Sequence, residues 1–226
     1  MRFVVLGEGI DEHGRCGKGP DLMPLREGSF QGSIVTLVRR LLRERHGIHA
    51  IPLCWTPVDR RHQGRPGPPP SAGEILSDEN LLPRFLEKLL CPVARNANQR
   101  AEADFVVLSC DLELEDRFLR AVARVRAELR SRVISIVFDP ELEVLFVQSK
   151  RPLEAMYGLR NCSTLPPTRL GDLKQSLQAW IRSYAPNARL DGEFRERVAR
   201  ELSFEELSGV PSWQTLEESL GRIVRP

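Results

Sequence analysis

The sequence lacks the features that would take this protein out of the class of ordinary globular domains. No apolar run reaches the roughly 20 residues that a transmembrane helix needs, and no signal-peptide pattern follows the first residues. The net charge of +2 is too small to indicate nucleic acid binding by itself. We therefore expect a cytoplasmic protein without membrane contact.

Cysteine is scarce and widely spaced. The five cysteines are Cys16, Cys54, Cys91, Cys110 and Cys162, and no two of them form a CxxC pair. This spacing argues against a disulfide framework and against a zinc knuckle. Cys54 and Cys110 lie in apolar runs, where we expect small core residues.

The common nucleotide-binding and hydrolase motifs are also missing. Residues 7–12 begin like a dinucleotide-binding fingerprint, but Glu12 stands where its third glycine belongs. Residues 14–19 resemble a phosphate loop, but no Ser or Thr follows Lys18. A GxSxG nucleophile motif is absent. These mismatches argue against a Rossmann cofactor site, a Walker A ATPase and a serine hydrolase.

What the chain does contain is an alternation of short apolar runs with amphipathic helical patterns. Such an alternation predicts a parallel sheet that helices cover on both faces. The fold class is therefore α/β, with a mainly parallel, Rossmann-like sheet of four strands. The predicted strands cover residues 2–6, 48–55, 104–110 and 132–138, and the predicted helices of this part cover 33–42, 81–90, 115–130 and 140–146.

The last third of the sequence has a different character, because helical patterns follow one another with no strand between them. We predict an α/β core over residues 1–150 and a helical C-terminal extension over 151–226 that packs on this core. The predicted helices of the extension cover 171–184, 192–202 and 212–223. Within the core, the proline-rich and arginine-rich residues 57–73 are predicted to form a mobile loop. Arg60, Arg61 and Arg65 in this loop either contact phosphate or form a solvated surface.

Acidic residues follow two of the predicted strands. Glu8 comes two residues after the strand that ends at Leu6, and Asp111 and Glu113 come directly after the third strand. Ligands of open α/β sheets bind at the carboxyl ends of the strands. If the two strands are neighbours, these carboxylates form a candidate Mg²⁺ site, since magnesium prefers hard oxygen ligands. The alternative is that they are helix caps or solvated loop ends, and the residue types leave both readings open.

Taken together, these features resemble the Toprim-like fold, and specifically the uncharacterised bacterial Toprim-like proteins of the DUF4276 type. Toprim domains carry a Glu after the first strand and an Asp-x-Asp after a later one. Glu8 in the run LGEG and the pair Asp111 and Glu113 match this pattern, with Glu in place of the second Asp. An acidic segment that contains Glu143 and a helix start that contains Lys174 are similar to the narrower family, as is the C-terminal run SFEEL.

The resemblance implies an Mg²⁺- or Mn²⁺-dependent hydrolase of the nuclease type that cleaves phosphodiesters. Glu8 would transfer a proton or bridge the metal, and Asp111 and Glu113 would bind the metal. Glu143 would be a further metal-binding acid, and Lys174 a catalytic phosphate contact. The expected partners are a nucleic acid and an ATPase protein, in a bacterial defence system.

Two other functions remain open at this stage. One is a non-catalytic Toprim-like interaction module that binds a partner protein. Its contact surface would be the C-terminal helices, through the aromatic residues Trp180, Phe194 and Trp213. The other is a small-molecule phosphohydrolase, which would use the same metal chemistry.

Overall fold

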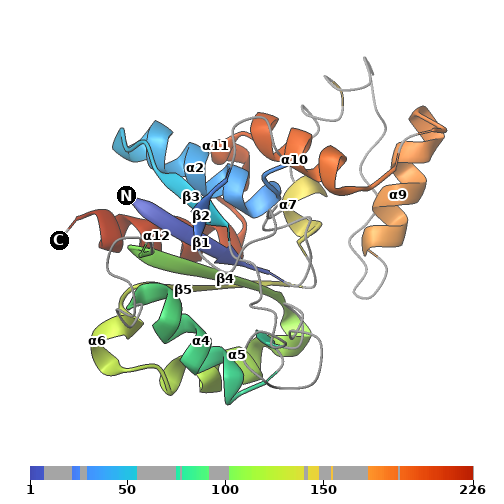
Figure 1. Cartoon of the computed structure of the whole chain (residues 1–226). Helices are drawn as coiled ribbons and strands as arrows, with labels where there is room; N and C mark the ends of the chain where they lie inside the picture. The colour runs from blue at the N-terminus through green and yellow to red at the C-terminus, as the bar shows by residue number, and fades with distance from the viewer. Residues whose placement is uncertain are drawn as a thin grey trace.

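A mainly parallel sheet of five strands forms the centre of the computed structural model (Figure 1). The structure describes residues 1–7, 22–25, 30–54, 75–76, 78–91, 102–139, 142–147, 154, 173–187 and 189–225. The four parallel strands are β1 (Arg2–Leu6), β3 (Ile51–Cys54), β4 (Phe105–Asp111) and β5 (Val133–Phe138). The predicted four-stranded sheet is confirmed. The fifth strand, β2 (Met23–Pro24), is antiparallel to β3 and too short to leave a sequence pattern.

The strands lie in the order β2-β3-β1-β4-β5. From β1 the chain therefore goes first to β3 on one side and later to β4 and β5 on the other. This reversal makes the boundary between β1 and β4 a topological switch point. Phe3 of β1 lies opposite Phe105 of β4, and their rings stack with centroids 5.4 Å apart.

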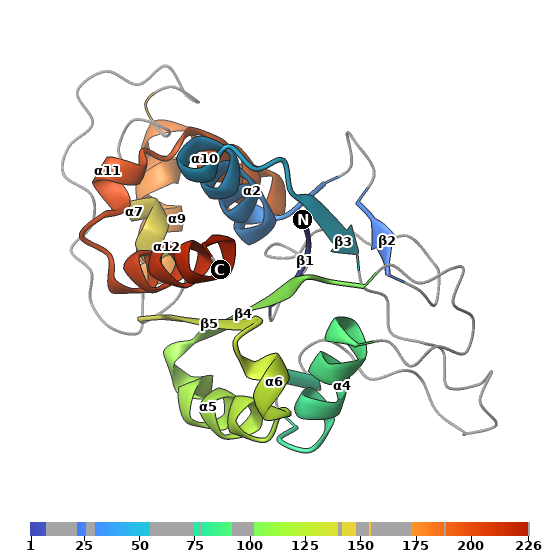
Figure 2. The same cartoon turned by 90° about the vertical axis from the view of Figure 1, so that its left-hand side faces the viewer.

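Helices cover both faces of the sheet, as Figures 1 and 2 show from two sides. One face carries α4 (Leu81–Leu90), α5 (Glu115–Ala123) and α6 (Ala127–Arg130). The other carries α2 (Ser33–His46) and α7 (Val144–Val147) together with the C-terminal helices. Each face therefore has its own hydrophobic core, the first under α4 and α5 and the second under α2 and the C-terminal helices. Because successive side chains of a strand point to opposite faces, Val4 and Leu6 belong to the first core and Phe3 and Val5 to the second.

The C-terminal helices share the second core with the sheet. They are α9 (Leu173–Tyr184), α10 (Gly192–Glu201), α11 (Phe204–Leu207) and α12 (Pro211–Val224). α10 packs on α2, and α12 packs on β5. Trp180, Phe194 and Trp213 are buried there. The prediction that these aromatic residues form an exposed contact surface is therefore wrong, because they are the inward faces of amphipathic helices.

Two further local predictions are wrong. The helix predicted over 115–130 breaks after Ala123 and resumes at Ala127, and Leu119 of α5 is exposed. Cys54 is buried in the core as predicted, but it is disulfide-bonded, which the cysteine spacing had argued against. Cys110 is the buried thiol that the sequence predicts. Widely spaced cysteines give no local signal of such a pairing. The loop predicted over 57–73 lies outside the described residues.

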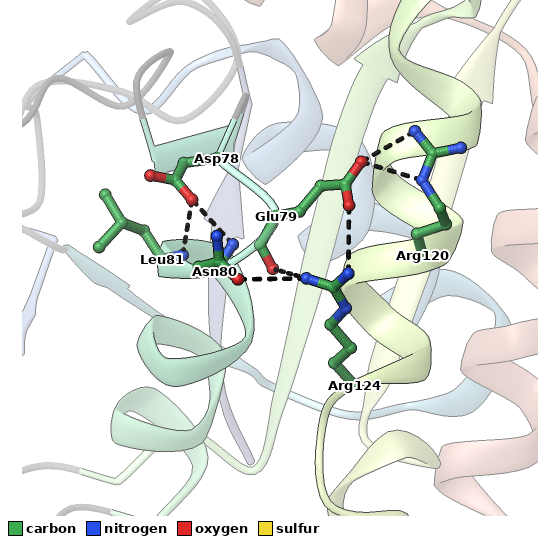
Figure 3. Close-up of polar contacts among 6 residues, drawn as sticks. All are labelled: Asp78, Glu79, Asn80, Leu81, Arg120 and Arg124. Carbon is green, nitrogen blue, oxygen red and sulfur yellow. Dashed lines mark hydrogen bonds and ion pairs between the residues drawn. The ribbon is translucent and has the colours of Figure 1, made fainter.

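A group of acidic and basic residues joins the beginning of α4 to α5 (Figure 3). Glu79 accepts hydrogen bonds from Arg120, whose Nη2 lies 2.8 Å from Glu79 Oε1, and its other oxygen lies 3.4 Å from Arg124 Nη2. Asp78 Oδ1 accepts from the backbone N–H of Asn80 at 2.8 Å. The hydrogen bond from Arg120 lowers the pKa of Glu79 from its ordinary value of 4.5. These contacts stabilise the packing of two helices on one face of the sheet.

Candidate metal centre

The carboxyl ends of β1 and β4 lie side by side at the switch point. Leu6, the last residue of β1, is opposite Leu108, and β4 continues for three more residues to Asp111. Ser109 is fully buried at this boundary, and its hydroxyl donates a hydrogen bond of 3.5 Å to the carbonyl of Leu6. Gly7, the next residue of the chain, is also buried. The neighbouring strands that the acidic site requires are thus present.

Asp111 stands at the very end of β4, opposite Phe138 of β5. Its backbone is extended, and the 3₁₀ turn η2 (Leu112–Leu114) begins directly after it. Asp111 occupies the N-cap position of this turn, yet its side chain makes no capping hydrogen bond. Its place is therefore not explained by the capping role that the alternative reading gave to these acids.

The other acids after β4 differ in position. Glu113 is exposed on η2, and Glu115 and Asp116 lie in the first turn of α5. Carboxylates in a first turn are favourable because they oppose the positive end of the helix dipole. Glu115 and Asp116 thus have an ordinary structural explanation, and Asp111 and Glu113 remain the candidates for metal binding.

Glu8 lies outside the described residues, so its role stays a prediction. Within the described part of the chain, no group of three or more His, Cys, Asp or Glu side chains is gathered as a metal site. Asp111 and Glu113 supply two hard oxygen donors, and Mg²⁺ often takes only one or two carboxylates and completes its shell with water and phosphate oxygens. The donor chemistry of this segment therefore fits the ion.

Glu143, the fourth predicted metal ligand, lies between β5 and α7 and is only 3% exposed. Its Oε1 accepts a hydrogen bond from Nη2 of Arg195 on α10, which is itself 7% exposed. A buried carboxylate in contact with a guanidinium already has its counter-charge. Metal binding by Glu143 would require this pair to separate, and we leave Glu143 out of the ligand set that we propose below.

Arg195 is a residue that the sequence analysis missed, and so is its neighbour Glu196. Glu196 is buried on α10 and accepts a hydrogen bond of 2.9 Å from the backbone N–H of Gln31, just before α2. It also forms an ion pair with Arg200. The only sequence signal was that two charged residues fall on the inward side of an amphipathic helix.

Lys174 lies in the first turn of α9 and is exposed. Among the described residues, none forms an ion pair with it, and the structure does not bring it into contact with Asp111 or Glu113. Its predicted contact with phosphate stays a prediction.

Comparison of the chain with protein-family models, with curated proteins and with solved structures finds no match. None of the helices in the described residues is long and apolar enough to cross a membrane.

Proposed function

We propose that this protein is a Toprim-like, divalent-metal-dependent phosphodiesterase whose site lies where β1 and β4 end. One observation supports the proposal above the others. β1 and β4 are parallel neighbours at a topological switch point, and the chain places Glu8 just after one of them and Asp111 at the end of the other. A site at this position agrees with the general location of ligands in open α/β sheets.

In this proposal Asp111 and Glu113 bind Mg²⁺ or Mn²⁺. A bound ion of this kind polarises a phosphodiester and lowers the pKa of a bound water. Glu8 transfers a proton at the same edge, and Lys174 contacts a phosphate oxygen. The buried hydroxyl of Ser109 on β4 donates a hydrogen bond to the carbonyl of Leu6 and so joins the two strand ends.

The biological setting follows from the family resemblance alone. A phosphodiesterase of this type would act on a nucleic acid, alongside an ATPase partner in a bacterial defence system. The non-catalytic alternative has lost its proposed contact surface, because the aromatic residues of the C-terminal helices are buried. We therefore take hydrolysis as the function to test first.

The test is hydrolysis of labelled DNA, labelled RNA and a chromogenic phosphodiester by the purified protein with Mg²⁺ or Mn²⁺. Asp111→Asn should lower the rate on the order of a hundredfold or more, as loss of a group that stabilises the transition state does in other enzymes. Asp116→Asn is the matched control, since it removes the same charge five residues further along. An Asp111→Asn protein as active as the Asp116→Asn protein would refute the assignment.

A further inference from the structure

A polar cavity lies along the outer side of α2, and none of the switch-point acids lines it. Its volume is about 560 Å³, and its walls come from α2, from the segment that leads into β3, and from α10. Figures 1 and 2 both show α2 and α10 side by side. The charged and titratable residues that line it are Arg39, Arg40, Arg43, Arg200, His49 and Glu44.

The arginines face this cavity because the opposite side of α2 is buried. The helix turns its aliphatic residues into the core beneath it, and these are Ile34, Val35, Leu37, Val38, Leu41 and Leu42. Arg39 and Arg43 are four positions apart, so that they are neighbours on one side of the helix, with Cβ atoms about 5–6 Å apart. An array of guanidinium groups therefore runs along α2 and is continued by Arg200.

One of the four arginines has a structural role. Arg40 Nε lies 3.0 Å from Glu44 Oε1, and Arg40 Nη1 donates hydrogen bonds of 2.9 Å to the carbonyls of Ala199 and Leu202. Its guanidinium also lies over the ring of Phe204. Arg40 thus joins α2 to the end of α10, and it lies closer to Glu44 than Arg43 does.

The other three arginines, Arg39, Arg43 and Arg200, keep N–H donors that a ligand can use. In the described part of the chain, the only partner of Arg39 is the neutral side-chain amide of Gln31, at 2.5 Å. Arg43 is 61% exposed, and its Nη2 lies 3.7 Å from Glu44 Oε1, beyond hydrogen-bond distance. Arg200 pairs with Glu196 through one nitrogen and is 59% exposed. The cavity therefore has an excess of positive charge.

We propose that this cavity binds the phosphate groups of a phosphorylated ligand, with Arg39 and Arg43 as the principal donors and Arg200 as a further contact. Guanidinium groups are planar, remain charged and match phosphate oxygens in pairs. A cavity of this size accommodates a ligand of nucleotide dimensions or a stretch of nucleic acid backbone. The inference does not depend on the proposed hydrolysis, because none of its residues belongs to the switch-point site.

The experiment measures binding by two probes, pyrophosphate by calorimetry and a short fluorescein-labelled single-stranded DNA by fluorescence anisotropy. Metal is omitted so that no cleavage occurs. The test variant is Arg39→Gln/Arg43→Gln. The control is Arg117→Gln/Arg182→Gln, which removes the same charge from exposed positions on α5 and α9.

The test variant should bind at least one probe about a hundredfold more weakly, while the control stays close to wild type, since charge-assisted hydrogen bonds are lost only in the first. For the DNA probe, the salt dependence of log K should also fall by about 1.4 for two lost phosphate contacts. Binding of pyrophosphate alone identifies a compact phosphate ligand, and tight binding of DNA identifies a nucleic acid backbone. Equal losses in both variants, or no binding of either probe by the wild-type protein, would overturn the proposal.

Discussion

Asp111 and Glu143 both follow the carboxyl end of a strand, yet their surroundings differ completely. Asp111 is half-buried at the end of β4 and is followed in the chain by further acids on η2 and α5. Glu143, just beyond β5, is buried and paired with Arg195 from a helix 52 residues further along the chain. The comparison shows that a carboxylate near the end of a strand is a candidate metal ligand at Asp111 and part of a buried ion pair at Glu143.

The largest expected effect is on folding, at Glu143. Glu143→Gln should lower the free energy of unfolding by roughly 3 kcal/mol, because Arg195 would stay buried without its counter-charge. Urea denaturation of wild type, Glu143→Gln and Asp111→Asn measures the difference, and Asp111→Asn is the matched change at a half-buried position.

If Glu143 and Arg195 act as a buried ion pair, the same urea denaturation should give a second result. The double variant Glu143→Leu/Arg195→Met should regain most of the lost stability, because an apolar pair of similar volume replaces a buried ion pair at little cost. A Glu143→Gln protein as stable as the wild type would remove the contrast between the two acids.

A smaller effect is expected at Asp111, and it should depend on metal. Without metal, Asp111→Asn should lower the free energy of unfolding by less than Glu143→Gln does, because Asp111 is half-buried and Glu143 is buried in an ion pair. With Mn²⁺ at about a hundred times its dissociation constant, the wild type should gain about 2.7 kcal/mol, and Asp111→Asn should not. Thermal unfolding with Mn²⁺ and with EDTA measures both quantities. An equal gain in the two proteins would place the ion elsewhere.

The smallest effect is expected at Glu79, an acid that is neither buried nor a candidate ligand. Its pKa is lowered in the folded protein, chiefly by the hydrogen bond from Arg120. A lowered folded-state pKa contributes stability above the unfolded-state pKa, and the contribution is lost as the pH falls through the folded-state pKa. Glu79→Gln should therefore lower the urea midpoint slightly at about pH 7, and this difference should shrink as the pH falls below the unfolded-state pKa of the carboxyl. A difference that stays constant on acidification would mean that the contact does not act through charge.

The sequence was sufficient for the elements that local patterns define. The parallel strands were predicted from short β-branched runs, and the predicted end of β4 is within one residue of Asp111. Contacts between residues far apart in the chain could not be predicted from the sequence. Nothing near Glu143 indicates Arg195, because their meeting depends on how α10 packs against α2 and α7. Trp213 was predicted to be exposed for the same reason, since its burial depends on α12 packing on β5.

The functional residues also include some that the sequence predicted and others that it did not. Asp111 and Glu113 were found because an acidic run after a buried strand is visible in the sequence. Whether β1 and β4 are neighbours was left open there, and the strand order of the structure supplies it. The phosphate cavity along α2 was not predicted. The helix predicted over 33–42 contains Arg39 and ends before Arg43. The surplus charge of these two arginines becomes apparent only when Arg40 is seen to engage Glu44 and the end of α10.

The central claim is a metal ion at the switch point, and a crystal structure of the protein soaked in Mn²⁺ tests it most directly. The account predicts an anomalous peak at the carboxyl ends of β1 and β4, with oxygens of Asp111 and Glu113 about 2.1 Å from the ion, the distance typical of octahedral Mg²⁺ sites. A peak held by Glu115 and Asp116 instead, or no peak at this edge at a saturating concentration of Mn²⁺, would contradict it.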